Sequence, residues 1–203
     1  MDSREFIYRL DGLDRLIFAN QNWFDFAREN GADALLDQRL TLGKPIWSFI
    51  SDPTIRQLFR KLGEKVRKTA TAVTLPFRCD SPDCRRFMEM EIRPRAKDGI
   101  EFRSRVLREE RREPIQLLSA DRDHSEGTLI MCSWCKKVSV PALGWVELET
   151  AIKGLNLFCA SPYPQISHGI CEDCARAIRS VLERNGERPA SRESRLILSE
   201  QRF

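Results

Sequence analysis

Arg86–Arg93, with the sequence RFMEMEIR, is the stretch that decides the fold. Its two methionines and its isoleucine alternate with charged residues, and a period of two predicts a β-strand with one buried and one solvated face. Ile100–Leu107 repeats this alternation, and Ala72–Arg78 precedes both stretches as a further strand. Three successive strands of this kind predict an antiparallel sheet.

Two more strands and a helical region lie upstream of these three. Phe6–Leu10 and Arg15–Phe18 flank a turn-forming tetrapeptide, DGLD, which predicts a β-hairpin. Asn20 is a suitable N-cap for a helix that continues to about Glu29, and helical spacing of apolar residues predicts a second helix near Thr54–Lys68. The sequence therefore predicts an α+β protein, with a five-stranded antiparallel sheet and helices on one side of it.

The segment from about residue 5 to residue 107 resembles a PAS domain. Tyr8–Gly12 and Ile17–Asn20 are similar to the hairpin that opens a PAS domain and leads into an asparagine-capped helix. Asn22–Ala27 is similar to that helix. The resemblance implies a sensor or interaction domain.

PAS domains often hold a cofactor, and the composition of this one restricts the choice. Residues 1–120 contain no histidine, so a histidine-ligated haem is not expected. The cysteine of a flavin photosensor would stand on a helix in the middle of the domain. The first cysteine of this chain, Cys79, lies beyond those helices, so no flavin is predicted either. Five aromatic side chains are candidates to line a small-molecule pocket, with simple packing in the core as the alternative: Trp23, Phe26, Trp47, Phe49 and Phe59.

Length, charge and cysteine content narrow the class of protein. A chain of 203 residues has room for one ordinary domain and a small one. Lys and Arg number 34 against 30 Asp and Glu, a balance too even to identify a nucleic-acid binder. No window approaches the ~18 consecutive apolar residues of a membrane helix, and no signal peptide is present at the N-terminus. We therefore expect a cytoplasmic protein without a membrane partner, in which clustered cysteines bind metal more often than they form disulfides.

Two Cys-x-x-Cys pairs carry the strongest chemical signal. Cys132 and Cys135 form the first pair, and Cys171 and Cys174 form the second. This spacing lets both thiolates of a pair face one point, and four thiolates are the ligands of a closed, structural zinc site. The second pair is expected to open a helix, whose positive N-terminal dipole helps to keep thiolates ionised. A knuckle, an intervening element and a ligand-bearing helix predict a treble-clef-like arrangement.

Other metal-ligating or thiol side chains have more than one interpretation. His168 either replaces a cysteine as a ligand, or hydrogen-bonds to a thiolate, or is a turn residue with no metal role. Cys79 and Cys84 are either a redox or metal-sensing pair or ordinary hairpin residues. Cys159 is expected to pack as a small hydrophobic residue.

The cysteine-rich segment also resembles a known family. Cys132–Val138, Gly144–Trp145 and Ser167–Cys174 are similar to a module attached to PAS sensor kinases and response regulators in bacteria, which typically has the motifs C-[AS]-x-C-K-[KR]-[IV], G-x-W and S-H-G-[IL]-C-P-x-C. The chain departs from the family at Glu172, where proline is usual, and in a shortened stretch before Trp145. Neither departure touches a proposed ligand. The resemblance implies a bacterial protein of two-component signalling.

These observations predict four segments and rank three functions. We expect a PAS-like domain over 1–107, a charged linker over 108–127, a zinc-binding module over 128–185 and a disordered tail over 186–203. The leading hypothesis is a non-enzymatic signalling adaptor or sensor that contacts a kinase or response regulator and pairs as a homodimer, because no glycine-rich nucleotide loop or phosphoacceptor helix is present. The first alternative is a DNA-binding regulator, since residues 175–203 hold seven Arg against four Glu. The second is a thiol redox protein whose Cys-x-x-Cys pairs cycle as dithiols.

Overall fold

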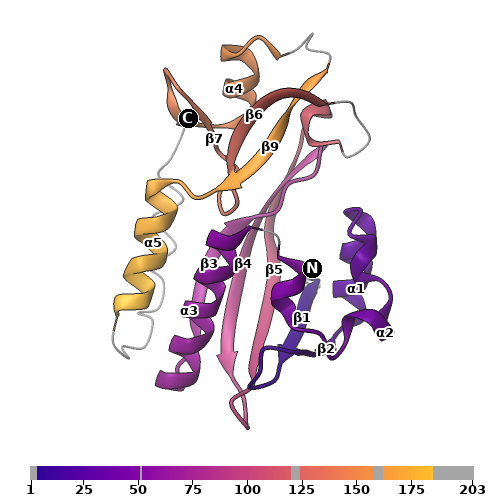
Figure 1. The fold of residues 1–203 in the computed structure, drawn as a ribbon, viewed down its shortest axis with the longest axis vertical. Helices are drawn as coiled ribbons and strands as arrows, with labels where there is room; N and C mark the ends of the chain where they lie inside the picture. Colours follow the sequence, from indigo (N-terminus) through magenta and orange to yellow (C-terminus); the bar gives the residue numbers. More distant parts are fainter. Residues whose placement is uncertain (1–3, 51, 120–123, 158–161, 185–203) are drawn as a thin grey trace.

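Two β-sheets, stacked end to end, organise the protein in the computed structural model, which describes residues 4–50, 52–119, 124–157 and 162–184 (Figure 1). The first sheet is five-stranded and antiparallel, with the order β2-β1-β5-β4-β3. Its strands are β1 (Glu5–Leu10), β2 (Leu16–Ala19), β3 (Val73–Arg78), β4 (Cys84–Pro94) and β5 (Ile100–Arg111). The second sheet is four-stranded, with the order β8-β7-β6-β9, and contains β6 (His124–Cys132), β7 (Val138–Val140), β8 (Gly144–Val146) and β9 (Tyr163–Gly169).

Helices connect the strands of both sheets. The first sheet is interrupted after β2 by α1 (Gln21–Glu29), the 3-10 helix η1 (Asp33–Leu35), α2 (Gln38–Thr41), the 3-10 helix η2 (Ile46–Phe49) and α3 (Pro53–Thr69). A further 3-10 helix, η3 (Gln116–Leu118), precedes the second sheet, which is completed by α4 (Leu148–Gly154) and followed by α5 (Glu172–Glu183). The chain is thus a mixed α+β protein with a five-stranded antiparallel sheet, as the sequence predicts.

The local signals that predict the first sheet act as expected. Met88, Met90 and Ile92 of β4 are 3%, 4% and 0% exposed, so the alternating pattern separates a buried face from a solvated one. The Asn20 side chain caps α1 by accepting a hydrogen bond from the Trp23 amide at 3.0 Å. The same side chain joins the helix to β1, because its Oδ1 also accepts from the Ile7 amide at 3.0 Å.

Helices α1 and α3 cover the same face of the first sheet. The Tyr8 ring of β1 stacks on Phe102 of β5, with centroids 4.6 Å apart. Trp23 of α1 lies 6.1 Å from Tyr8, and Phe59 of α3 lies 6.1 Å from Phe102. The main core therefore lies between this face and the two helices.

The opposite face of the first sheet carries paired charges. Glu101 is 3% exposed and forms ion pairs with Arg9, Arg95 and Arg103. Burial alone would raise the pKa of Glu101, but hydrogen bonds from Arg9 and Arg103 and the charges of these arginines lower it below its ordinary value. Ion pairs therefore surround the Glu101 carboxylate on this face, in place of the apolar packing of the other face.

The segment expected as a charged linker contains regular structure. Strand β5 continues to Arg111, four residues beyond the expected end at Leu107, because its register with β4 extends as far as Cys84 opposite Arg111. Ile115 and Leu117 are buried in a second core between η3, β7 and α4. The division into domains remains a prediction, and the expected tail over 186–203 and Cys159 lie outside the described residues.

No helix in the described part of the chain is both long and apolar enough to cross a membrane.

Candidate metal centre

Four cysteine side chains converge at the junction of the two sheets. The Sγ atoms of Cys132, Cys135, Cys171 and Cys174 all lie within 4.8 Å of one another, and those of Cys135 and Cys171 are 3.7 Å apart. Tetrahedral coordination at about 2.3 Å per zinc–sulfur bond places sulfur atoms about 3.8 Å apart. The cysteines are free thiols with no disulfide among the described residues, so the cluster can hold a metal ion.

Parallel pairing of β6 with β9 brings the two cysteine pairs together. Cys132 is the last residue of β6 and pairs with Gly169, the last residue of β9. Both strands therefore end at one edge of the second sheet. The Ser133 amide donates a 2.8 Å hydrogen bond to the Gly169 carbonyl oxygen and continues this contact beyond the strands.

A tight turn presents the first pair. The Cys132 amide donates to the Lys137 carbonyl oxygen at 2.7 Å, and the Lys136 amide donates to the Cys132 carbonyl oxygen at 2.9 Å. Lys136 adopts a left-handed conformation, with φ of 63°, which lets the chain reverse within these six residues. We call residues 132–137 the knuckle.

The N-terminus of α5 presents the second pair. Cys171 is the N-cap residue and Cys174 lies in the first turn, as the sequence predicts. The Cys171 amide donates to Cys132 Sγ at 3.4 Å, so a backbone N–H group of the helix start stabilises negative charge on that sulfur.

Without a cation the clustered thiols cannot all ionise. Hydrogen bonds from Cys135 and Cys174 lower the pKa of Cys132. The same bonds, donated toward Cys132, raise the pKa of Cys135 to about 12 and that of Cys174 further. One thiolate thus forms at the expense of its neighbours, and a divalent cation is the group that would stabilise all four as thiolates.

The knuckle is joined directly to the first sheet. Trp134 is 7% exposed, and its ring centroid lies 5.7 Å from that of Phe59 and 6.4 Å from that of Phe77. Its Nε1 donates to the Pro76 carbonyl oxygen at 2.6 Å, and the Arg78 amide donates to the Trp134 carbonyl oxygen at 2.8 Å. The candidate metal site therefore shares the core of the first sheet.

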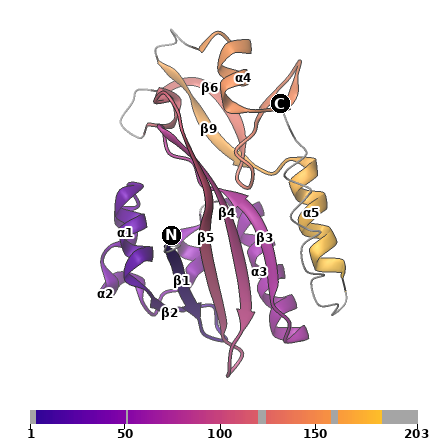
Figure 2. The same ribbon diagram turned by 180° about the vertical axis from the view of Figure 1, so that it is seen from behind.

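Helix α5 lies beside α3 and shares this core as well (Figures 1 and 2). Ile178 of α5 is fully buried in the core cluster that contains Leu62 and Val66 of α3. At the other end of α5, Lys65 Nζ donates to the carbonyl oxygens of Leu182 and Arg184 at 3.0 and 2.5 Å. The helix is thus held at its start by the cysteine cluster and at its end by a lysine of α3.

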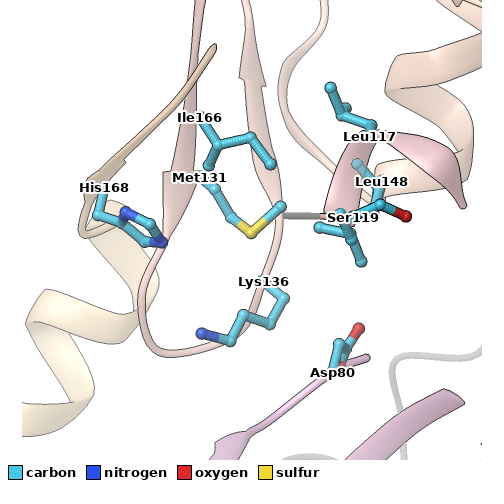
Figure 3. A pocket seen from close by; sticks show the side chains of 9 residues that line it. Asp80, Leu117, Ser119, Met131, Lys136, Leu148, Ile166 and His168 are labelled. Carbon is cyan, nitrogen blue, oxygen red and sulfur yellow. The ribbon is translucent and has the colours of Figure 1, made fainter. Parts of the chain in front are cut away.

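His168 lies beside the cysteine cluster and outside it. The group of converging ligand atoms consists of the four cysteines, and the structure describes no hydrogen bond from His168 to any of them. Its side chain instead lines a cavity next to Lys136 (Figure 3). Partial burial, and then the nearby charge of Lys136, lower the pKa of His168.

The other predicted candidates lie apart from the cysteine cluster. Cys79 and Cys84 are free thiols in the loop and strand that follow β3, and neither belongs to the group of converging ligands. Burial raises the pKa of Cys79. None of the five predicted pocket aromatics lines the cavity of Figure 3; four belong to the main core or pack against it, namely Trp23, Trp47, Phe49 and Phe59, and Phe26 packs on Phe6 with centroids 4.6 Å apart.

A partly buried cluster of charges lies between the two sheets, and none of the sequence patterns predicted it. Arg78 is 7% exposed and bonds to Asp80 and, at 2.6 Å, to Glu147. Glu149 of α4 forms ion pairs with Arg85 at 2.5 Å and with Arg112 at 2.8 Å. The three arginines and three carboxylates balance in charge and join the end of the first sheet to α4. Because Arg78 and Glu147 are 69 residues apart, no local pattern indicates the contact.

Comparisons with known proteins give structural likenesses alone. No protein-family model and no curated protein matches the chain. Among solved structures, the chain is similar to a domain of an HTR-like protein from Haloarcula marismortui, with 16% sequence identity and a TM-score of 0.39. The match covers 52% of this chain and 100% of that domain. A likeness of this size identifies no function for the chain.

Proposed function

We propose that the chain is a non-enzymatic signalling adaptor or sensor, in which a PAS-like domain and a treble-clef-like zinc module act together through contacts with another signalling protein. The sequence resemblances suggest both parts. The succession of a hairpin, a helical middle and three antiparallel strands in one sheet agrees with the first, and the converging cysteines agree with the second.

Zinc is the metal that this donor set favours. Four thiolates suit zinc, which prefers tetrahedral sulfur coordination, and they leave no open position for a reactive water. Cys132, Cys135, Cys171 and Cys174 would hold the ion, which would supply structural stabilisation and no chemistry of its own. Lys136 and Lys137 would offset part of the net negative charge of the four-thiolate site.

The observation that carries the proposal is the docking of the knuckle on the first sheet. Trp134 bonds to Pro76 and Arg78 of β3, and α5 packs along α3, so the metal site and the PAS-like core form one structure. Metal binding would therefore set the position of α5 relative to the sheet, and α5 presents exposed side chains to a partner.

The test combines zinc content with partner binding. The full chain should contain one zinc ion per molecule by mass spectrometry of the metal, and should co-purify with a sensor kinase or response regulator from a bacterial host. Cys174→Ser should lose both the ion and the partner, whereas the matched control Cys79→Ser should keep both. A metal-free native chain, or full partner binding by Cys174→Ser, would contradict the proposal.

The nucleic-acid alternative retains one structural observation. Arg176 and Arg179 are exposed on α5, and Arg60 and Lys61 are exposed on α3, the helix beside it. Binding of duplex DNA that weakens steeply with salt, and that is lost in Arg176→Gln with Arg179→Gln, would favour this function over a protein partner.

A further inference from the structure

A cavity of about 320 Å³ lies between the second sheet, η3 and the start of α4, next to the knuckle (Figure 3). Its floor is apolar and is made by Leu117, Leu118, Met131, Leu148 and Ile166. Ligand cavities in proteins measure about 300–1,000 Å³, so this one suits a small molecule.

The polar part of the lining is cationic. Lys136 and His168 stand on one side, with Ser119 and Asp80 opposite (Figure 3). Lys136 Nζ donates to the Ser133 carbonyl oxygen at 3.1 Å, and an ammonium group has three donors, so this bond does not exhaust it.

Asp80 does not cancel this positive charge. Its carboxylate is 3% exposed and is paired with the guanidinium groups of Arg78 and Arg112, which neutralise it. Among the side chains that line the cavity, Lys136 therefore carries the uncompensated positive charge, with the imidazole of His168 and the hydroxyl of Ser119 as further polar contacts.

We propose that this cavity binds a small amphipathic monocarboxylate, whose carboxylate faces Lys136 and His168 and whose short hydrocarbon part lies on the apolar floor. One cationic side chain matches one negative charge, whereas a doubly charged phosphate would need more donors than this lining provides. The apolar floor favours a ligand with an apolar body over a free inorganic anion.

The position of the cavity couples it to the cysteine cluster. Met131 and Lys136 are immediate neighbours of Cys132 and Cys135, and His168 stands three residues before Cys171. A ligand held between them would contact all the segments that carry the cysteines. Its role as the input signal of the protein rests on the function proposed above, whereas binding itself does not.

Methyl NMR of methionine tests the site directly. The chain has four methionines, and Met131 lines the cavity while Met88 and Met90 lie in the first sheet. In the zinc-loaded full chain, hexanoate should shift the Met131 methyl signal to saturation without moving those of Met88 and Met90. Hexanamide, which has the same shape without the charge, should bind about tenfold more weakly or worse, because the charge-assisted bond to Lys136 is lost.

Variants at Lys136 and Leu118 test whether the ligand contacts the lysine charge and whether it lies in the cavity. Lys136→Met should lose the preference for hexanoate over hexanamide, whereas Lys137→Met, the same change one residue further along the knuckle, should keep it. Leu118→Trp should fill the cavity. The Met131 methyl signal should then shift with neither hexanoate nor hexanamide, while the zinc content is unchanged.

Three outcomes would overturn the inference: no shift of Met131, equal affinity for hexanoate and hexanamide, or equal losses in Lys136→Met and Lys137→Met. The zinc content of the same samples distinguishes these outcomes from a failure of the proposed function. A chain that contains zinc but does not bind hexanoate contradicts only the proposed ligand site.

Discussion

The indole Nε1 of Trp134 donates a 2.6 Å hydrogen bond to the carbonyl oxygen of Pro76, in the edge strand of the five-stranded sheet. Two residues further along β3, the Arg78 amide donates to the Trp134 carbonyl oxygen. An uncovered edge strand can pair with other chains, and here the knuckle occupies hydrogen-bonding groups in the second half of the strand, at Pro76 and Arg78. Pro76 suits this position, since proline is tolerated at a sheet edge.

Removal of the Trp134 hydrogen bond should destabilise the whole protein. Trp134→Phe keeps an aromatic ring but leaves the Pro76 oxygen without its donor, which should lower the free energy of unfolding by about 1–3 kcal/mol. Trp134→Ala also removes the ring from the core, at a cost of about 3–5 kcal/mol. Urea unfolding of the zinc-loaded chain measures both, with Trp145→Phe as the control. A Trp134→Phe variant as stable as the wild type would show that the bond is dispensable.

Acid should weaken the contact between α4 and the first sheet. Burial would raise the pKa of Glu149, but hydrogen bonds from Arg85, from its own amide and from Arg112 outweigh it and lower the pKa. A carboxyl group whose pKa is lowered on folding contributes stability that is fully present above its unfolded value, about 4.3, and is lost as the pH falls through the folded value.

The pH dependence can be assigned by comparing variants. The difference in unfolding free energy between wild type and Glu149→Gln should be largest near neutral pH and should shrink below about pH 4.3. Taking this difference cancels the effect of acid on the cysteine cluster and any metal bound there, which would be the same in both proteins. Glu64→Gln, an exposed change on α3, should show no such trend. A difference that does not vary with pH would contradict the assignment.

Lys65 should control the last turn of α5. Its ammonium group bonds to two carbonyl oxygens at the C-terminal end of that helix, which otherwise lack partners within the helix. Lys65→Met should therefore speed hydrogen exchange of the last α5 amides about tenfold, an opening easier by about 1.4 kcal/mol, without changing exchange in β4. Lys68→Met, an exposed change one turn along α3, should leave α5 as it is. Equal hydrogen-exchange rates of the last α5 amides in the two variants would show that the Lys65 contact does not stabilise this turn.

Zinc retention should depend on the cavity. If hexanoate binds between Met131, Lys136 and His168, it should raise the zinc affinity of the chain, measured in equilibrium competition with a chelator, and zinc should raise the hexanoate affinity by the same factor. Lys136→Met should abolish this effect, whereas Lys137→Met should preserve it. Identical zinc affinity with and without saturating hexanoate would show that the two sites are independent.

Local patterns predicted most of the first sheet and all four clustered cysteines. Period-two alternation located β4 and most of β5, and Asn20 located the start of α1, because each depends on neighbours within a few residues. The Cys-x-x-Cys spacing likewise indicates a common site, because both cysteines of a pair lie within one turn. The short helices between Asp33 and Phe49 carry no comparable signal, since a single turn has too few residues to show a period.

What the sequence did not reveal depends on contacts between distant residues. The bond between Trp134 and Pro76 spans 58 positions, and the ion pair of Arg112 with Glu149 spans 37. Such pairs form because of how the two sheets stack. The position of a tryptophan or an arginine in the sequence does not indicate which distant residue it contacts. His168 shows the same limit: its place in the chain left open a ligand role, a hydrogen bond to a thiolate or no metal role, and only the structure shows that its side chain lines the cavity.

The parallel pairing of β6 with β9 separates the geometry of the cysteine cluster from the length of chain between its halves. Both strands end at Cys132 and Gly169 whatever path joins them, and β7, β8 and α4 form an excursion outside that pairing. Lengthening a loop costs free energy only logarithmically, about 0.6 kcal/mol per doubling. A longer loop between β7 and β8, or between β8 and α4, should therefore leave the four thiols in place, because the pairing of β6 with β9 does not depend on the length of these loops.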